Sequence, residues 1–212
     1  MQLIDDPAPH SAPLNMAIDE VLLGTVAVPT LRFYRWLRPS LSFGYFGRFA
    51  AAAEVAGERD VVRRWTGGGI VLHGDDTTYS LILPRSYVAE PWSGRATYAF
   101  VHTAIAEVLS GSVDAHLAKT DAPKISEACF ANAVVADVLI GARKIAGAAQ
   151  RRTRAGLLHQ GSIQHENLPT SFADALAGRL CSGYERVQFA TPAAAEPLAA
   201  EKYATAAWSQ RR

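Results

Sequence analysis

Apolar residues follow two kinds of spacing along this chain, and together they predict a mixture of helices and strands. Over residues 94–109 they recur at steps of three and four, the spacing of an amphipathic helix. Residues 11–24 repeat that spacing after Ser11, whose side chain suits a helix N-cap. Weaker helical patterns cover residues 50–58, 170–180 and 199–208. We expect the first two helices to pack on a sheet.

Short apolar or alternating runs predict the strands of that sheet. They cover residues 30–36, 41–45, 59–65, 70–73, 77–83, 113–119 and 134–140. Pro39 separates the first two runs, and we expect the second to continue the first or to pair with it. Asp75 and Asp76 stand between the fourth and fifth runs, where the pair favours a turn over a metal site.

The stretch GARKIAGAAQRRTRAGLLHQGS, residues 141–162, predicts two short strands over 144–147 and 156–162, joined by a basic turn. Glycines and alanines surround Lys144, which leaves room for a molecule to lie against the backbone. Only four of the 21 Lys and Arg residues are lysines. An ammonium in such surroundings suits a carboxylate, a thioester oxygen or a phosphate. From this stretch alone, an exposed hairpin with a solvated lysine remains the alternative.

A second stretch, RRWTGGGIVLHGDDTTYSLIL over residues 63–83, also combines glycine with positive charge. Consecutive glycines let main-chain N–H groups approach a ligand closely, and the neighbouring arginines can hold anionic oxygens. The stretch lacks the spacing of a P-loop, so it does not predict the usual nucleotide-binding motif.

Taken together, the two stretches resemble the catalytic domain of lipoate-protein ligases and octanoyltransferases. RRWTGGGIVLH precedes TTYSLILP, and ARKIAGAAQRR precedes GLLHQGSI, which is the order of the family's motifs. The resemblance runs from about Leu14 to Trp208. It implies an α+β fold, shared with biotin-protein ligases, in which helices flank a central mixed β-sheet. It also implies transfer of octanoate or lipoate to a lysine of a lipoyl carrier domain.

The resemblance further implies which residues form the site. Lys144 matches the family's lysine at the acyl carboxyl end, and we predict that it is catalytic. We expect His73 to line the pocket without transferring a proton. The predicted substrate-binding residues are Arg63, Arg64, Thr66, Gly67, Gly68, Gly69, His73, Tyr79, Gly147, Gln150, His159 and Gly161.

Cys129, in Glu-Ala-Cys-Phe ahead of the run at 134–140, is the second predicted catalytic residue. A free cysteine is usually a small buried hydrophobic residue. In one octanoyltransferase branch, however, the acyl-accepting cysteine occupies a matching Ala-Cys-Phe, although ATP-dependent ligases can carry a similar pair. A thiolate close to Lys144 would have a lowered pKa and could accept an acyl group. We interpret Cys181 as structural.

Three hypotheses follow. The first is octanoyl or lipoyl transfer through a Cys129 thioester, with acyl carrier protein as a donor. The second is ATP-dependent ligation through lipoyl-adenylate, which would require ATP and Mg²⁺. The third is an inactive protein that only binds lipoyl domains. In each, the partner is a lipoyl carrier domain, either a 2-oxoacid dehydrogenase subunit or the glycine cleavage H protein.

Composition and charge limit the number of domains, the partners and the cellular location that we expect. With 212 residues, 19% charged residues and a net charge of +1, we expect one catalytic domain over residues 1–212, no C-terminal accessory domain and no attraction to nucleic acid. Basic residues cluster locally at Arg151, Arg152 and Arg154, which we place in the hairpin turn. Two cysteines make no disulfide framework or zinc motif, so no metal is expected. No signal peptide or membrane span is predicted, and we expect a cytoplasmic protein.

Overall fold

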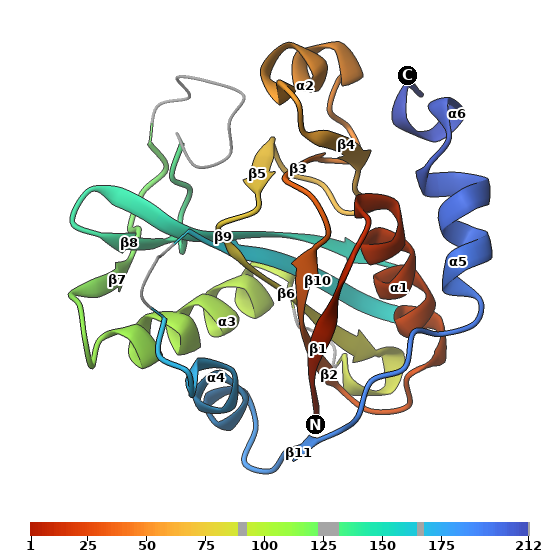
Figure 1. Cartoon of the computed structure of the whole chain (residues 1–212). Helices are drawn as coiled ribbons and strands as arrows, with labels where there is room; N and C mark the ends of the chain where they lie inside the picture. The colour runs from red at the N-terminus through yellow and green to blue at the C-terminus, as the bar shows by residue number, and fades with distance from the viewer. Residues whose placement is uncertain (89–92, 123–131, 165–167, 212) are drawn as a thin grey trace.

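An eight-stranded mixed sheet forms the centre of the protein (Figure 1). The computed structural model describes residues 1–88, 93–122, 132–164 and 168–211. In spatial order the strands are β11 (Glu185–Arg186), β1 (Gln2–His10), β2 (Thr30–Trp36), β6 (Thr77–Pro84), β10 (Gly156–Ile163), β9 (Arg143–Arg152), β8 (Val138–Ile140) and β7 (Ala115–Leu117). β1 is parallel to both of its neighbours, and the remaining pairs are antiparallel. The predicted mixed sheet is confirmed.

Helices cover both faces of this sheet because its strands carry apolar side chains on both sides. α3 (Gly94–Leu109) and α4 (Phe172–Leu180) pack on one face, against Leu81 and Leu157 among others. α1 (Ala12–Thr25), α5 (Ala195–Leu198) and the π-helical segment η3 (Ala199–Tyr203) pack on the other, against Ile82 and Leu158. We call these the α3 face and the α1 face. Ser11 caps α1, as predicted, by accepting a hydrogen bond from the amide of Leu14.

A smaller sheet lies beside the large one, at the top of Figure 1. Its order is β4 (Asp60–Arg63), β3 (Ser40–Phe43) and β5 (Val71–His73), and α2 (Phe49–Ala56) packs against it. The expectation that the run at 41–45 continues or pairs with the run at 30–36 was wrong. The chain leaves the large sheet around Pro39, and β3 pairs with β4 and β5 instead.

Three further segments differ from their predictions. β1 was not predicted, because its aspartates and prolines conceal the apolar pattern. The run at 134–140 begins with a turn, in which Asp137 donates its amide to Val134 and accepts that residue's amide on Oδ2, so that only β8 is extended. The closing helix at 199–208 is interrupted, because Thr205 caps a separate α6 (Ala206–Ser209).

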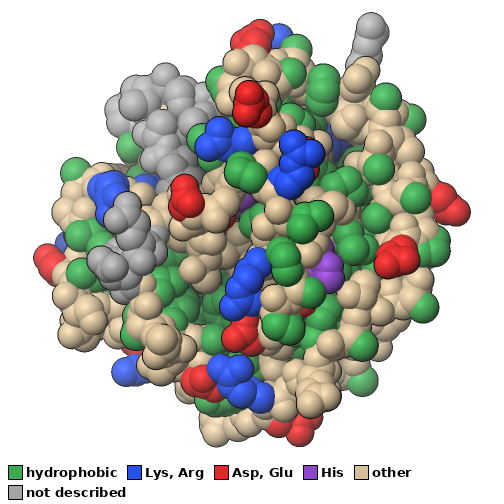
Figure 2. Space-filling view, in the orientation of Figure 1, with side chains coloured by type: hydrophobic (Ala, Val, Ile, Leu, Met, Phe, Trp, Pro, Cys, Tyr) green, Lys and Arg blue, Asp and Glu red, His purple; other side chains and the backbone are tan. Residues whose placement is uncertain are grey.

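The β9–β10 hairpin is longer than predicted. Its strands pair from Ile163 with Ala146 as far as Leu157 with Arg152. Arg151 and Arg152 therefore belong to β9 and not to the turn, which corrects their placement. Basic and acidic side chains are interspersed over the face drawn in Figure 2. Among the described residues, no helix has the length and apolar character needed to cross a membrane.

Candidate functional site

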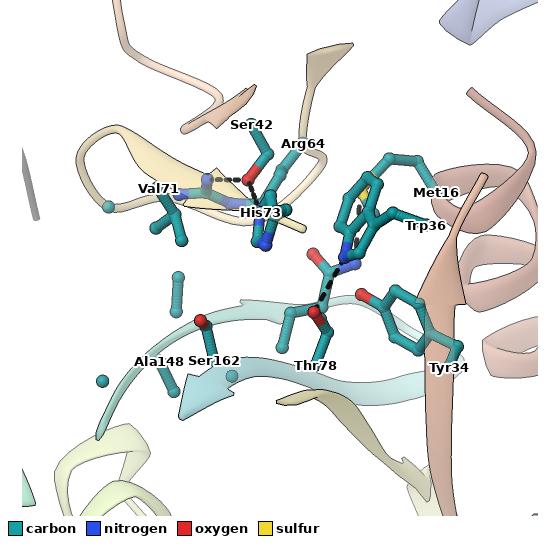
Figure 3. Close-up of a pocket in the computed structure, with 15 residues that line it drawn as sticks. Met16, Tyr34, Trp36, Ser42, Arg64, Val71, His73, Thr78, Ala148 and Ser162 are labelled. Carbon is teal, nitrogen blue, oxygen red and sulfur yellow. Dashed lines mark hydrogen bonds between the residues drawn. The ribbon is translucent and has the colours of Figure 1, made fainter. Parts of the chain in front are cut away.

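Two adjoining cavities lie where the small sheet meets the large one. The smaller, of about 30 Å³, is bounded by β3 and β5 on one side and by β9 and β10 on the other (Figure 3). The larger, of about 720 Å³, is lined by the glycine turn, α3 and β9. Gly68, Ala148 and Ala149 line both cavities. The two stretches singled out from the sequence are therefore brought together at this junction.

Lys144 is buried on β9 and forms an ion pair with a residue that the sequence did not indicate. Its ammonium lies 2.8 Å from Oδ2 of Asp137, which is itself fully buried. The hydroxyl of Tyr98 donates to Oδ1 of Asp137, and it accepts a hydrogen bond from the amide of Ala148. Burial and the Asp137 charge raise the pKa of Tyr98, so its hydroxyl remains a donor. The interpretation of Lys144 as a solvated residue on an exposed hairpin is wrong.

Two glycines of the β9–β10 hairpin leave space that other side chains fill. A Cβ at Gly147 would lie 2.6 Å from Cε of Lys144, so the missing side chain admits the lysine's end. A Cβ at Gly161 would overlap the ring of Tyr79, its cross-strand neighbour on β6. Both glycines line the smaller cavity through their backbones. At both positions the close approach to the main chain is made by a side chain of the protein itself, Lys144 at Gly147 and Tyr79 at Gly161.

Arg64 is buried against the glycine turn of residues 67–69. One terminal nitrogen, Nη2, donates to the carbonyls of Gly67 and Gly69, each at 2.9 Å. The other, Nη1, donates to Oγ of Ser42 at 2.7 Å. Gly68 has a φ of 84°, in the left-handed region that favours glycine. Arg64 thus fixes the shape of the turn and also lines the smaller cavity.

The adjacent Arg63 has a different place, which corrects its assignment to the substrate pocket. It lines neither of these two cavities, and its guanidinium donates to main-chain carbonyls of two other segments. These carbonyls belong to Tyr45, Gly47, Trp208, Ser209 and Arg211. Arg63 ends β4 and Arg64 directly follows it, and successive side chains of an extended segment point to opposite sides. Arg63 therefore joins the C-terminal segment to the small sheet.

Tyr79 and His159 also lie away from the cavities, in the core on the α3 face of the sheet. Both are fully buried, and Nε2 of His159 lies 3.2 Å from the Tyr79 hydroxyl. Burial, together with the nearby His102, holds the pKa of His159 well below its ordinary value, so this histidine is neutral. Gln150 links this core to the site, because it lines the larger cavity and donates to Nδ1 of His159 at 2.9 Å. The structure corrects Tyr79 and His159 from pocket residues to core residues.

Thr66 reaches the smaller cavity only through Gln160. Its hydroxyl donates to Oε1 of Gln160 at 2.8 Å, and Nε2 of Gln160 donates to the buried Asp19 of α1 at 2.8 Å. Asp19 is in turn paired with the buried Arg32 at 2.9 Å. Gln160 therefore ties the cavity to the charged groups under α1. Sequence reasoning did not select it, although it directly precedes Gly161 in the GLLHQGSI segment.

His73 lines the smaller cavity, as predicted, in surroundings that the sequence did not reveal. Its ring stacks on Trp36 with 4.1 Å between the centroids, and Nδ1 lies 2.8 Å from Oδ2 of Asp76. Burial raises the pKa of Asp76. His73 and the hydrogen bonds from His73, Ser162 and the Gly74 amide outweigh that effect, so the pKa of Asp76 lies below its ordinary value.

Comparison with known proteins identifies the family. Residues 11–199 match the sequence profile of the lipoyl protein ligase A/B catalytic domain. The chain belongs to this family. It is 36% identical over 167 residues to the octanoyltransferase LipM of Oceanobacillus iheyensis, an alignment covering 73% of this chain and 60% of that protein. It is 38% identical over 172 residues to LipM of Kyrpidia tusciae, covering 72% and 62%. The chain thus spans about three fifths of the length of these curated relatives.

Solved structures show that the fold is that of lipoate ligases. Ta0514 from T. acidophilum, whose structure contains bound lipoic acid, superposes with a TM-score of 0.76 at 20% identity, covering 99% of this chain and 98% of that chain. The lipoate protein ligase from Thermoplasma acidophilum described as bi-partite, with its E2 lipoyl domain, superposes with a TM-score of 0.72 at 19% identity, covering 99% and 95%. At these identities the likeness establishes the family's fold.

One predicted site residue of this family member, Cys129, lies outside the described residues. Sequence reasoning missed three residues that line the smaller cavity, Ser42, Thr78 and Ser162, because serine and threonine in a strand carry no distinctive spacing. Asp137 was missed because it interrupts an otherwise apolar run. Within the described part of the chain, no group of three or more His, Cys, Asp or Glu side chains could hold a metal ion.

Proposed function

We propose that this domain transfers an octanoyl or lipoyl group to the lysine of a lipoyl carrier domain through a thioester on Cys129. The observation that carries the proposal is the buried Lys144–Asp137 pair, which lies directly behind Gly147 of the smaller cavity's lining, while the two side chains themselves line neither cavity. The identity of 36% and 38% to octanoyltransferases supports the choice of acyl group.

The lining of the cavities suits an acyl chain and its carrier. The larger volume, about 720 Å³, lies in the usual range of small-molecule sites, roughly 300–1,000 Å³. We assign to it the acyl carbonyl and the arm of the carrier. The chain would extend from the junction toward Met16, Trp36 and Val71 of the smaller cavity. The smaller cavity must widen to accept the acyl chain, and the Met16 side chain can make room because it is unbranched and has several rotatable bonds.

The reaction has two steps in this proposal. The Cys129 thiolate attacks the carbonyl carbon of the donor thioester, and the donor leaves as a thiolate that takes up a proton. The lysine amine of the lipoyl domain then attacks the Cys129 thioester, loses a proton as the amide forms, and releases the Cys129 thiolate. Dividing the transfer in this way is the advantage of nucleophilic catalysis.

Lys144 supplies positive charge where the carbonyl oxygen becomes negative in both steps. Its ammonium is held by Asp137 at 2.8 Å, so its position is set before the substrate arrives. A preorganised charge of this kind stabilises an oxyanion without reorganising during the reaction. The proposed acyl acceptor is a lipoyl carrier domain of a 2-oxoacid dehydrogenase subunit or the glycine cleavage H protein, and acyl carrier protein is the proposed donor.

Intact-mass spectrometry of a purified lipoyl domain tests this function. The domain is incubated with wild-type protein and either octanoyl-acyl carrier protein or free lipoate with ATP and Mg²⁺. We expect one octanoyl group to be added from the carrier, with Cys129→Ser inactive and the matched control Cys181→Ser active. Modification by lipoate and ATP that survives in Cys129→Ser would instead establish the adenylate-forming ligase. Binding of the lipoyl domain without any modification would establish the inactive binder.

A further inference from the structure

Three side chains beside the smaller cavity form a continuous hydrogen-bonded chain. Ser42 of β3 and His73 of β5 face each other across the small sheet, with 2.6 Å between Oγ and Nε2 (Figure 3). Behind the ring, Nδ1 of His73 lies 2.8 Å from Oδ2 of Asp76. The order serine, histidine, aspartate is that of the serine hydrolase triad, which is recognised by geometry and not by sequence position.

The surroundings of Ser42 argue against its acting as a nucleophile. Its Oγ already accepts a hydrogen bond from Nη1 of Arg64 at 2.7 Å, and the residue is fully buried. Ser42 lines the smaller cavity, which takes the acyl chain in the proposed arrangement, and not the larger cavity, to which the acyl carbonyl is assigned. A reacting carbonyl would have to lie within roughly 3–3.5 Å of Oγ. We therefore take Arg64 as the group through which these hydrogen-bonded side chains affect the site, and we do not assign a nucleophilic role to Ser42.

The partners of Asp76 determine which group donates and which accepts in each hydrogen bond that links Asp76, His73 and Ser42. Oδ2 of Asp76 accepts from Ser162 at 2.6 Å and from Thr78 at 3.0 Å in addition to His73, while Oδ1 accepts from the Gly74 amide at 3.2 Å. This carboxylate requires His73 to carry its proton on Nδ1. In the neutral imidazole, Nε2 then accepts from the Ser42 hydroxyl, which leaves a lone pair of Oγ for Arg64.

Ser42 also affects the glycine turn, because it holds the Arg64 guanidinium that binds the turn. With Nη1 held by Ser42, Nη2 faces the carbonyls of Gly67 and Gly69. In a trans peptide the N–H points away from the carbonyl of the same unit, so the amides of Gly68 and Ile70 point away from the guanidinium. Gly67 and Gly68 line the larger cavity. Arg64 thus decides how the turn presents its amides beside the proposed acyl carbonyl.

We propose that Ser42, His73 and Asp76 are positioning residues for acyl transfer, which act by holding Arg64 and, through it, the glycine turn. The inference rests on the proposed function and adds to it a set of residues that make no contact with the reacting atoms. Their loss should lower the rate of the chemical step more than it weakens binding of the acyl donor, because the turn shapes the site around the carbonyl.

Asp76→Asn is the sharpest test, because the surroundings dictate how the new amide must lie. The Gly74 amide can only donate, so the asparagine oxygen must occupy the Oδ1 position. The asparagine NH₂ then faces Nδ1 of His73 and forces the ring proton to Nε2. Ser42 loses its acceptor. We expect ¹⁵N chemical shifts of the imidazole to report the exchanged tautomer, and kcat to fall about tenfold with KM for the octanoyl donor little changed.

A matched serine pair keeps the test decisive if Asp76→Asn folds poorly. Ser40 and Ser42 are both buried on β3, but the Ser40 hydroxyl donates only to the Arg38 carbonyl, at 2.8 Å. We expect Ser42→Ala to lower kcat several-fold relative to Ser40→Ala at comparable melting temperatures. Equal kcat values in the two variants would overturn the inference. So would an octanoyl ester on Ser42 that resists neutral hydroxylamine, because Ser42 would then be a nucleophile.

The two proposals fail in different ways. If wild-type protein leaves the lipoyl domain unmodified, the proposed transfer is wrong. The His73 tautomer still reports whether Asp76, His73 and Ser42 are hydrogen-bonded as described. If wild-type protein is active and Ser42→Ala matches Ser40→Ala, the transfer stands and the positioning role is wrong.

Discussion

Arg63 and Arg64 are neighbours in the sequence, yet they serve two different regions. Arg63 donates hydrogen bonds to the main-chain carbonyls of Trp208, Ser209 and Arg211, and so holds the C-terminal segment on the small sheet. We call these four residues the latch. We give the name cavity wall to the residues that line the smaller cavity, together with the Lys144–Asp137 pair directly behind Gly147. Arg64 lies in the cavity wall, where it binds Ser42 and the glycine turn.

Charge alone therefore does not distinguish a site residue from a structural one. Both arginines are buried, and both donate hydrogen bonds to backbone carbonyls, of five residues for Arg63 and of two for Arg64. What differs is the place of those carbonyls, because one set closes the fold and the other lines a cavity. Substitutions in the latch should change the free energy of unfolding, and substitutions in the cavity wall should change the rate of transfer.

The largest effect is expected at Lys144, in the cavity wall. Lys144→Ala removes the charge facing the acyl carbonyl, and transfer should fall roughly 10²-fold or more. The change also strands Asp137 in the interior, at a cost of about 3–5 kcal/mol in stability. Thermal unfolding of Lys144→Ala and of Lys144→Arg, which keeps a cation beside Asp137, separates the two effects. A folded Lys144→Ala protein that retains transfer within about tenfold of wild type would remove Lys144 from the site.

Arg64→Lys should come next, with transfer reduced about 10- to 100-fold. A lysine ammonium cannot reproduce the planar fork that reaches Ser42, Gly67 and Gly69 together. Steady-state kinetics with octanoyl-acyl carrier protein provide the measurement. A kcat equal to that of wild type would contradict the proposed difference between the cavity wall and the latch, because Arg64 would then not affect transfer.

Arg63→Lys is the matched substitution in the latch, and here we expect the reverse outcome. Losing several charged hydrogen bonds to carbonyls should lower stability by about 2 kcal/mol. In a protein of this length that corresponds to roughly 4–8 °C in Tm. Calorimetry gives the shift, and kcat of the folded protein should stay close to wild type. A large loss of kcat without a change in Tm would place Arg63 in the site after all.

The smallest effect is expected at Gly147, and it sharpens the picture of the cavity wall. An alanine Cβ there would lie 2.6 Å from Cε of Lys144, so the lysine must move away from Asp137. Transfer should fall about three- to tenfold, since the charge is displaced and not removed. Gly178→Ala, in α4 with its nearest neighbour at 3.9 Å, is the control and should leave transfer unchanged. Equal rates for the two variants would show that the position of the ammonium does not matter.

The sequence predicted the elements well where their spacing was regular. Apolar periodicity gave the limits of α3, and the small residues around Lys144 indicated a hairpin there, although its first strand is longer than predicted. Spacing does not say which side of a strand faces a ligand. For that reason Tyr79 and His159, correctly placed on β6 and β10, proved to lie in the core on the α3 face.

Contacts between distant segments were the other limit. Asp137 meets Lys144 only because the chain turns at residues 134–137, and that turn lies inside an apolar run that predicted a strand. Ser42, His73 and Asp76 meet because β3 pairs with β5 in a sheet that spacing did not separate from the large one. Such partners depend on how strands pair, which local patterns leave open.

The most direct test of the central claim is the mass of the protein itself after it is mixed with octanoyl-acyl carrier protein alone. With no lipoyl domain present, the acyl group should remain on the protein. We predict a gain of one octanoyl mass, lost on treatment with neutral hydroxylamine, and carried by the peptide containing Cys129 and not by the one containing Cys181. An unmodified protein that nevertheless octanoylates a lipoyl domain when one is added, or an acyl group on any other residue, would contradict the account.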